Sequence, residues 1–472
     1  MIDIQDFITE RGGDPEKIRQ SQKLRYADVD LVDKIIASFV SLALCVLQNK
    51  IMEKILLIQM PCTKGRPQKD AVCRDADRYM NATNASSSEI NATQKAIGQL
   101  KKNKQDATEL LQKKTELEKQ KAAQEELAKS KLIALQALAK TVGNYVHPSV
   151  PVSNNEDDNE EVKVWAPEGV DVKKLRLGGY DPERGTKLVG HRGYCLIGMG
   201  LFLNMALIQY GLHFLYSKGY TPNQPPFMLN KAEMAKTAQL SDFDESLYKV
   251  VEDEKDSSTD KYLIATSEQP ISCMHANEWL QPGELPIKYA GYSTNFRKEA
   301  GSHGKDAWVC YLGLFRVHQF EKIEQFVFCK PEESWNELEN MLSTAEEFYQ
   351  SLKLPYHVVA IVSGALNNAA AKKYDLEAWF PFQKEYKELV SASNCTDYQT
   401  RELEIRYGVK KAKEAPGGTR KEYVHALNAT LCATERTLCC VLENYQREDG
   451  VEVPEVLRKF IPGNPEFLRK PL

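Results

Sequence analysis

Long stretches with widely spaced apolar residues characterise the first third of the chain. Residues 79–100 and 106–142 together contain one glycine and no proline, and apolar positions recur at a spacing of seven, as in Ile90 and Ile97. A heptad spacing of this kind is typical of helices that meet along a narrow seam. We therefore expect two long helices here, paired as an antiparallel helical hairpin.

A different pattern begins after residues 143–161, a linker rich in proline, asparagine and acidic residues. Residues 201–216 form a strongly apolar run that ends before a proline-rich segment, as a helix followed by extended chain would. A buried core helix and a subunit-interface helix both fit this run. Residues 296–326 show the alternation of two strands, joined by a polar loop that contains glycine. The pattern predicts an α+β region after the helical one.

Composition and charge narrow the class of protein. The 472 residues carry a formal net charge of -4, which argues against a uniformly basic nucleic-acid coat protein, so any contact with nucleic acid is expected to be local. The 11 cysteines form no paired CxxC clusters, which favours free thiols in a reducing, cytosolic compartment. The apolar run at 37–48 is shorter than the roughly 20 residues that a membrane span needs, and the acidic N-terminus predicts no leader peptide.

A local excess of positive charge occurs within the predicted helical hairpin. Residues 95–131 contain ten lysines and six acidic residues. A solvated coiled-coil surface would have this pattern, and so would an arm that lies along a nucleic-acid backbone and displaces its counterions. Charge patterning alone leaves both interpretations open.

Candidate chemistry gathers on the two predicted strands of the β-hairpin. Phe320, Lys322 and Glu324 share one face because side chains alternate, and Phe320 and Glu324 are roughly 13 Å apart along the strand. An aromatic platform at one end and a carboxylate at the other would suit a base and an ammonium group. Arg297 and Glu299 share a parity on the first strand, and an arginine suits a phosphate. A charged hairpin that faces water is the alternative.

Three further stretches add polar groups. The sequence TSEQ at 266–269 offers a hydroxyl and a carboxylate in a short turn, and residues 388–401 form a strand-like run of hydrogen-bonding groups. Residues 425–445 are predicted to form one helix, on which Asn428 and Arg436 lie about two turns apart on one face. Buried polar groups need partners, and a ligand is one way to supply them.

These stretches resemble the seryl-tRNA synthetases of the eukaryotic cytosolic type, a family of class II aminoacyl-tRNA synthetases. Motif 2 of the family is similar to FRKEAGSHGKDAW with FRVHQFEKIEQF, and motif 3 is similar to HALNATLCATERTLCCVLENY. Motif 1 resembles GLFLNMALIQYGLHFLYSKGYTPNQPPFM, and the family's N-terminus resembles IQDFITERGGDPEKIRQSQ. The likeness covers most of the chain.

The resemblance implies an N-terminal antiparallel helical hairpin, the coiled-coil arm, followed by a class II synthetase domain with an antiparallel β-sheet flanked by helices. It implies a tRNA-binding arm at 1–150 with an atypical insert at 39–74, a linker at 151–182 and a catalytic domain at 183–472. It also implies a homodimer, binding of serine tRNA by the basic arm, and ligation of L-serine to that tRNA with ATP. Whether selenocysteine tRNA is also charged stays open.

The resemblance assigns roles in ATP binding to matching positions. Arg297 would bind the α-phosphate and the serine carboxylate, Phe320 would stack on adenine and Glu299 would bind its amino group. Arg436 would hold the γ-phosphate. Because the serine carboxylate is already ionised, no protein base is needed, and His318 is expected to bind nucleotide. The implied ATP-binding residues are Arg297, Lys298, Glu299, Val317, His318, Gln319, Phe320, Glu388, Leu389, Val390, Ser391 and Arg436.

Metal and serine sites are implied in the same way. Glu388 and Ser391 would hold Mg²⁺, a hard cation suited to oxygen ligands, and no zinc is expected. The division of work between the two serine-site carboxylates is open, and Thr434 is either a ligand contact or a packing residue. The implied serine-binding residues are Thr266, Ser267, Glu268, Arg297, Glu324, Asn428 and Thr434. The residues expected to be catalytic are Arg297, Glu324 and Arg436.

Three stretches depart from the family pattern. Residues 309–312 are extra in the β-hairpin loop, and a change of register there would turn Phe320 and Glu324 away from the site. Residues 39–74 have no counterpart in the family, and 172–185 are shorter than its usual connection. These departures leave open a catalytically silent relative that binds tRNA or has a regulatory role. A coiled-coil scaffold protein is a more distant alternative, because it would not require Arg297, Glu324 and Arg436 in these motifs.

Overall fold

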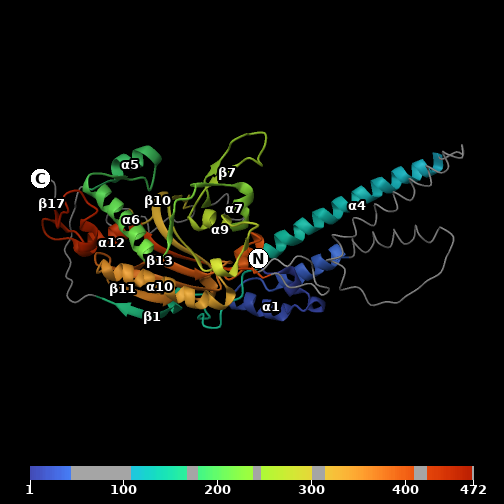
Figure 1. Ribbon diagram of the computed structural model, residues 1–472, viewed down its shortest axis with the longest axis horizontal. Coiled ribbons are helices and arrows are strands. Elements are labelled where there is room, and N and C mark those ends of the chain that lie inside the picture. The colour runs from blue at the N-terminus through green and yellow to red at the C-terminus, as the bar shows by residue number, and fades with distance from the viewer. Residues whose placement is uncertain (44–107, 167–178, 238–245, 300–313, 409–421, 470–472) are drawn as a thin grey trace. The chain divides into compact units, whose positions relative to one another are not determined.

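The computed structural model describes residues 1–43, 108–166, 179–237, 246–299, 314–408 and 422–469 (Figure 1). The chain divides into two compact units. One unit contains Ile2–Lys23 and Asp28–Val142, and the other contains Met1, Leu24–Ala27 and Gly143–Leu472. The expected domain limits at residues 150 and 182 stay predictions.

Helices make up the described part of the first unit. The shorter ones are η1 (Ile4–Phe7), η2 (Thr9–Arg11), α1 (Pro15–Leu24) and the helical residues 30–43. The second long helix, predicted at 106–142, is confirmed as α4 (Thr108–Lys140) and is unbroken in Figure 1. The first long helix, predicted at 79–100, lies outside the described residues, as does most of the insert at 39–74.

An eight-stranded sheet forms the centre of the second unit, as far as the described residues extend. Its order is β1-β11-β12-β13-β15-β10-β9-β4, and all neighbours are antiparallel except β4 and β9. The strands are β1 (Glu160–Trp165), β4 (Thr221–Asn223), β9 (Ile287–Phe296), β10 (Gln319–Cys329), β11 (Tyr356–Ala360), β12 (Lys372–Phe380), β13 (Glu385–Asn394) and β15 (His425–Ala433). The predicted antiparallel sheet is therefore confirmed.

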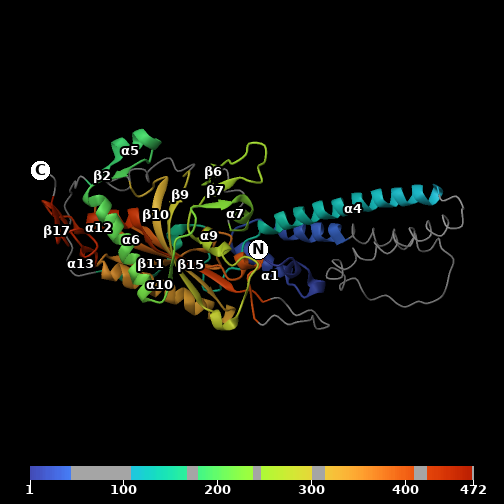
Figure 2. The same ribbon diagram turned by 45° about the horizontal axis from the view of Figure 1, so that its top comes forward.

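Three helices pack on one face of this sheet and close the main core. They are α6 (Met199–Ser217), α10 (Ser334–Ser351) and α12 (Thr434–Tyr445), which lie together over the strands in Figures 1 and 2. The core joins side chains such as Leu207 of α6 and Leu342 of α10 to Ile323 and Val327 of β10. Because side chains alternate along a strand, the neighbouring positions of β10 point to the opposite face.

Smaller elements surround the central sheet. The helices are α5 (Pro182–Val189), α7 (Lys231–Thr237), α9 (Glu268–Cys273), α11 (Tyr398–Glu402), α13 (Glu455–Arg458), η3 (Glu156–Asp158), η4 (Pro282–Glu284), η6 (Pro331–Glu333) and η7 (Ser363–Ala365). The strands are β2 (Tyr180–Asp181), β3 (Cys195–Leu196), β5 (Met228–Asn230), β6 (Lys249–Val250), β7 (Lys261–Leu263), β8 (Trp279–Leu280), β14 (Arg406–Tyr407), β16 (Gly450–Glu452) and β17 (Phe467–Arg469).

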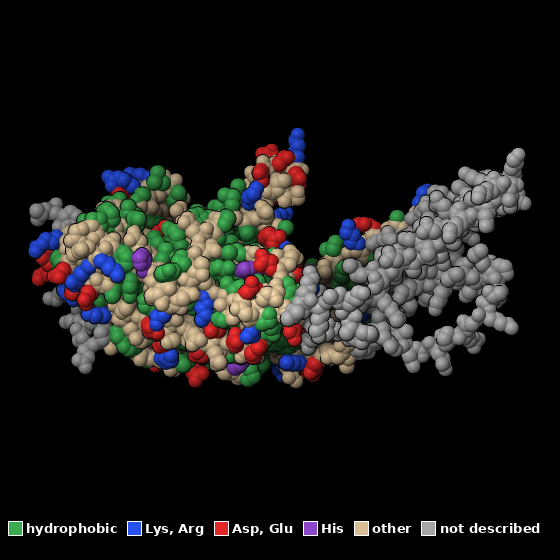
Figure 3. Space-filling model, viewed as in Figure 1, with side chains coloured by type: hydrophobic (Ala, Val, Ile, Leu, Met, Phe, Trp, Pro, Cys, Tyr) green, Lys and Arg blue, Asp and Glu red, His purple; other side chains and the backbone are tan. Residues whose placement is uncertain are grey.

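Helix α6 has two apolar faces with different surroundings. Leu203, Leu207 and Leu215 are buried in the core, which confirms a core helix at the predicted position. Met199 and Met205 remain exposed, and apolar side chains gather over α5 and α6 at the surface (Figure 3). Among the described residues, no helix has the length and apolarity required to span a bilayer.

The single helix predicted for residues 425–445 is wrong. Residues up to Ala433 form strand β15, and the helix α12 begins at Thr434. Strand β15 pairs with β10 along most of its length and with β13 at Leu427, Asn428 and Ala429, so its backbone groups find partners in the sheet. Tertiary pairing overrides the helical reading, and Asn428 and Arg436 lie on different elements.

Candidate active site

A cavity of about 250 Å³ lies against the face of the sheet opposite the main core. Strands β10, β13 and β15 contribute to its wall, together with α9, the start of α12 and the segment that follows β9. Its lining residues are Thr266, Glu268, Arg297, Glu299, Leu314, Phe315, Arg316, Val317, Phe320, Lys322, Glu324, Asn367, Glu388, Leu389, Ser391, Ser393, Asn428, Thr430, Ala433, Glu435 and Arg436.

Strand β10 and the residues that follow β9 contribute to one side of the cavity. The two strands lie side by side in Figure 2. Their register runs without a shift from Phe296 opposite Gln319 to Ile287 opposite Phe328. The Arg297 N–H donates to the His318 backbone carbonyl at 2.9 Å, which continues the pairing of the two strands past the end of β9. The predicted common face is confirmed, since Phe320, Lys322 and Glu324 all line the cavity. The extra residues 309–312 lie outside the described chain.

Two bulges set which side chains of β13 and β15 reach the cavity. On β13, Leu389 has no partner on β12, because Val390 pairs with Leu376 and Glu388 pairs with Glu377. An extra residue of this kind breaks the strict alternation, so Glu388 and Ser391 both line the cavity although they are three residues apart. Leu431 is the corresponding bulge residue of β15, because Thr430 pairs with Glu324 and Cys432 pairs with Ile323, which leaves Leu431 without a partner on β10.

Arg297 and Arg436 bring two guanidinium groups to the cavity wall. The Arg297 guanidinium donates to the Ala265 carbonyl at 3.3 Å and lies 5.1 Å from the centre of the Phe320 ring. Burial lowers the pKa of Arg297, and the positive charge of Arg436 lowers it further. Two cations that face a shared cavity attract an anion, because opposite charge relieves their mutual repulsion.

Arg436 is held by the chain on both sides. Its guanidinium donates to the carbonyls of Phe315 and Glu388, each at 3.1 Å, and lies 3.5 Å from a Glu388 carboxylate oxygen. Burial would raise the pKa of Glu388, but Arg436 and other nearby cations outweigh it and hold this pKa below its usual value. Glu388 is therefore ionised near neutral pH.

Two carboxylates also line the cavity, the buried Glu324 and the half-buried Glu268. Burial raises the pKa of both groups. Lys322 forms an ion pair with Glu324 and donates to the Thr266 hydroxyl at 2.8 Å, while Gln399 donates to Glu268 at 2.8 Å. Two carboxylates on one cavity wall can accept the cationic group of a ligand.

Glu388 and Ser391 offer two oxygen ligands on the cavity wall. An ionised carboxylate and a hydroxyl fit Mg²⁺, which takes few protein ligands and completes its shell with phosphate oxygens and water. Within the described residues, no group of three or more His, Cys, Asp or Glu side chains is arranged to hold a metal ion. The donor set therefore suits a cation that arrives with a phosphorylated ligand.

Most of the predicted site residues meet in this one cavity. Those that line it are Thr266, Glu268, Arg297, Glu299, Val317, Phe320, Glu324, Glu388, Leu389, Ser391, Asn428 and Arg436. Six others lie outside its lining: Ser267, Lys298, His318, Gln319, Val390 and Thr434.

Contacts within the protein explain the position of two of these six. The His318 ring bonds to the Arg297 backbone carbonyl at 2.9 Å, so it supports the end of the hairpin. Thr434 is fully buried, and its hydroxyl donates to the Glu321 carbonyl at 3.4 Å. For Thr434 the structure favours the packing role over contact with a ligand.

Several residues that line the cavity were not among the predicted site residues. Ser393 and Thr430 share the parity of Ser391 and Asn428, so strict alternation along each strand could have found them. The remaining ones are Leu314, Phe315, Arg316, Asn367, Ala433 and Glu435, together with Lys322, which was placed on the right face without a role as a site residue.

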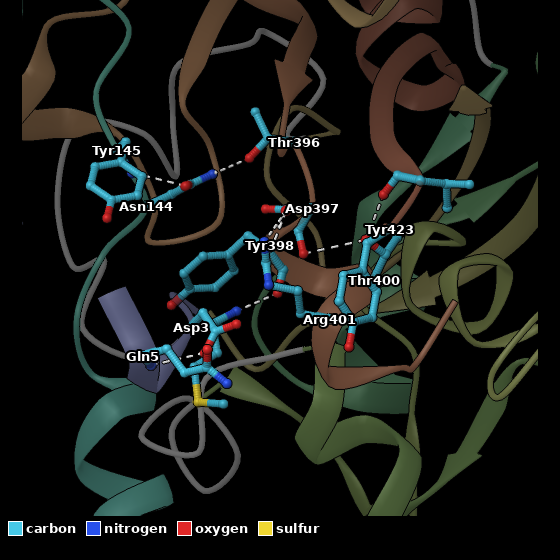
Figure 4. A network of polar contacts seen from close by, with 12 residues as sticks. Asp3, Gln5, Asn144, Tyr145, Thr396, Asp397, Tyr398, Thr400, Arg401 and Tyr423 are labelled. Carbon is cyan, nitrogen blue, oxygen red and sulfur yellow. Dashed lines mark hydrogen bonds and ion pairs between the residues drawn. The ribbon is translucent and has the colours of Figure 1, made fainter. Parts of the chain in front are cut away.

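Asn367 reaches the wall from a segment that a buried polar cluster holds. Asn144 donates to Thr396 at 2.9 Å and accepts from the Tyr145 N–H at 2.8 Å (Figure 4). Arg25 donates to the carbonyls of Asn144 and Asn367 at 2.8 and 3.1 Å, and burial lowers its pKa to about 10. These contacts span distant parts of the sequence, and no local pattern predicts them.

Comparison with known proteins relates this chain to a family of enzymes. The profile of the tRNA synthetase class II core domain (G, H, P, S and T) matches residues 248–445. The cytoplasmic serine–tRNA ligase of Saccharomyces cerevisiae is 54% identical over 99% of this chain and 96% of its own length. The corresponding protein of Arabidopsis thaliana is 48% identical over 98% of this chain and 95% of its own length.

Solved structures agree with these relatives. A cytoplasmic serine–tRNA ligase from Naegleria fowleri in complex with AMP has a TM-score of 0.76 and 42% identity, over 100% of this chain and 99% of that one. Seryl-tRNA synthetase from Pyrococcus horikoshii complexed with ATP has a TM-score of 0.77 and 33% identity, over the full length of both chains. The chain belongs to the serine–tRNA ligases, within the class II tRNA synthetases.

Proposed function

We propose that this protein is the ATP-dependent ligase that joins L-serine to serine tRNA in the cytoplasm. The observation that carries this proposal is that Arg297 and Arg436 line the same cavity as the carboxylates Glu268 and Glu324. The first pair suits the phosphates of ATP, and the second suits the ammonium group of an amino acid. The family to which the chain belongs supports the same activity.

The first step joins serine to ATP. A carboxylate oxygen of serine forms a bond to the α-phosphorus, the bond from that phosphorus to the bridging oxygen breaks, and pyrophosphate leaves. Arg297 stabilises the charge that builds on the α-phosphate during this exchange. No protein nucleophile is required. In the second step a terminal tRNA hydroxyl attacks the seryl carbonyl and releases AMP.

The two ends of ATP bind to different elements. Phe320 provides the face on which adenine stacks, and Glu299, which accepts a hydrogen bond from Arg316 at 2.6 Å, lines the same cavity. Arg436 binds the γ-phosphate from the first turn of α12. Bound Mg²⁺, held by Glu388 and Ser391, would neutralise phosphate charge. The remaining residues proposed for ATP binding are Lys298, Val317, His318, Gln319, Leu389 and Val390.

Serine binds at the carboxylate end. Thr266 and Glu268 receive its ammonium group, and Glu324 with Asn428 completes the pocket around the amine and hydroxyl. Both Glu324 and Asn428 are nearly buried, at 2% and 9% exposure. A buried site built to bond the substrate hydroxyl rejects alanine, because alanine leaves those polar groups without partners.

The partners proposed are a second copy of the chain and serine tRNA. The exposed apolar side chains over α5 and α6 support a homodimer, since burying such a patch is favourable. They are Leu188, Val189, Ile197, Met199, Leu201, Phe202 and Met205. The lysine excess of residues 95–131 supports the helical arm as the tRNA contact rather than a solvated coiled-coil surface.

Serine-dependent exchange of pyrophosphate into ATP tests the proposal. The purified 472-residue chain should catalyse exchange with serine and not with alanine, threonine or cysteine, with no tRNA present. Failure of a folded chain to catalyse exchange would contradict the proposal and favour the catalytically silent alternative. Recovery of exchange on deletion of residues 309–312 would then locate the defect in the hairpin loop.

A further inference from the structure

Glu435 is a buried carboxylate with no role in the chemistry proposed above. It lies in the first turn of α12, next to Arg436, and is 2% exposed. One of its oxygens accepts a hydrogen bond from the Tyr194 hydroxyl at 2.8 Å, and the other accepts from the Glu321 backbone N–H at 2.9 Å. A buried acid costs free energy unless its bonds are made, and these bonds join three separate segments.

The contact with Glu321 extends the pairing between β10 and β15. The backbone register of these two strands begins at Lys322 opposite Ala433. Glu321 lies one residue beyond that point, and its N–H is directed to the side chain of Glu435 instead of to a strand carbonyl. The carboxylate thus continues the pairing by one residue, where the chain turns from β15 into α12.

Glu321 is also held from its other side. Its carboxylate accepts from Asn204 at 2.6 Å and from the Tyr292 hydroxyl at 2.7 Å. Both the backbone and the side chain of this residue are therefore fixed. Phe320 precedes Glu321 on β10, so the position of the adenine platform depends on the same contacts.

We propose that Glu435 is a positioning residue that fixes the span between Phe320 and Arg436, the two ends of the ATP site. This inference rests on the proposed function, because it takes Phe320 as the adenine platform and Arg436 as the γ-phosphate ligand. ATP contacts both ends at once, whereas adenosine contacts the first and inorganic pyrophosphate the second. A fixed distance between Phe320 and Arg436 favours a ligand that contacts both, because the protein then loses less conformational freedom on binding.

Calorimetric titration of the full chain with ATP, adenosine and pyrophosphate separates these cases. Glu435→Ala should weaken ATP binding about tenfold, the scale of one buried hydrogen bond, and change the other two affinities less than about twofold. Glu443→Ala is the matched control. Glu443 is also a buried glutamate of α12, accepts from the Phe382 N–H at 3.2 Å and lies outside the cavity, so its loss should spare all three affinities.

Each outcome decides the inference. Equal losses for ATP, adenosine and pyrophosphate would indicate local disorder and overturn it, as would unchanged ATP affinity or the same effect in Glu443→Ala. If Glu435→Ala does not fold, Glu435→Asp carries the test, because its carboxylate is one methylene too short to reach both partners. Absence of ATP binding by the wild-type chain would overturn the proposed function too, whereas normal wild-type binding with an unaffected variant overturns this inference alone.

Discussion

The two faces of strand β10 differ in the side chains that they bury, apolar on one face and charged on the other. On one face Ile323 and Val327 are fully buried in the main core, against α6 and α10. On the other face Lys322 and Glu324 are also nearly buried, but they are charged and line the cavity. Apolar burial stabilises the fold directly, whereas the buried charges cost free energy that their partners and a ligand offset. Stability and function are therefore separable by face.

The largest effect is expected on the charged face. Arg297→Ala should lower serine-dependent pyrophosphate exchange by about 10³-fold, the scale of losing a group aimed at developing charge. Its effect on the free energy of unfolding should be small, because burial disfavours the Arg297 charge. Exchange assays with urea unfolding measure both. Arg447→Ala, outside the cavity, is the control, and a loss of stability that matches the loss of activity would contradict the separation of faces.

The reverse effect is expected on the apolar face. Leu342→Ala, in α10, should lower the free energy of unfolding by about 2–5 kcal/mol, because it removes a buried side chain and leaves a cavity. The KM values for serine and ATP should remain close to those of the wild type. Urea unfolding and steady-state exchange kinetics measure the two quantities. A large change in either KM without unfolding would show that the faces are coupled.

A smaller effect is expected at the proposed metal site. Glu388→Gln should raise the Mg²⁺ concentration for half-maximal exchange by about 10–100-fold, because an ionised oxygen ligand is lost. Magnesium titration of the exchange rate measures the shift. Direct Mn²⁺ binding in the presence of ATP, followed by electron paramagnetic resonance, gives a second readout. An unchanged metal requirement would remove Glu388 from the site.

The smallest effect is a pH dependence at Glu435. Burial raises its pKa from 4.5 to about 7, although the Glu321 N–H and the Tyr194 hydroxyl oppose this shift, and the Glu321 charge adds to it. A raised pKa means that the folded chain binds the proton more tightly, so this group favours folding below about pH 4.5 and loses that contribution as the pH rises through 7. The difference in unfolding free energy between wild type and Glu435→Gln should therefore fall over this range. A flat difference in urea unfolding would contradict the raised pKa.

The sequence predicted the parts of the site that follow one regular period. Phe320, Lys322 and Glu324 were placed on a common face correctly because β10 keeps strict alternation through them. Residues 425–445 were misread because strand pairing, which is a long-range property, decides where β15 ends and α12 begins.

The rest of the site depends on contacts that no local pattern encodes. The bulge at Leu389 places Glu388 and Ser391 on one wall, and a strict period of two would separate them. Asn367 reaches the cavity through a loop held by Arg25, more than 300 residues away in the sequence, as the separation of 342 positions shows. The resemblance to the family supplied the residues of the bulge where periodicity could not.

Because of the bulges at Leu389 and Leu431, the cavity depends on the number of residues in β13 and β15. Replacing either leucine by methionine or isoleucine conserves the number of residues, and a library of substitutions should contain many active variants at both positions. Deleting either codon restores regular alternation. The side chains on one side of the deletion then change faces, so those that lined the cavity point to the core and those of the core point to the cavity. In a deletion scan of the gene, these two codons should therefore behave as essential, whichever amino acid they encode.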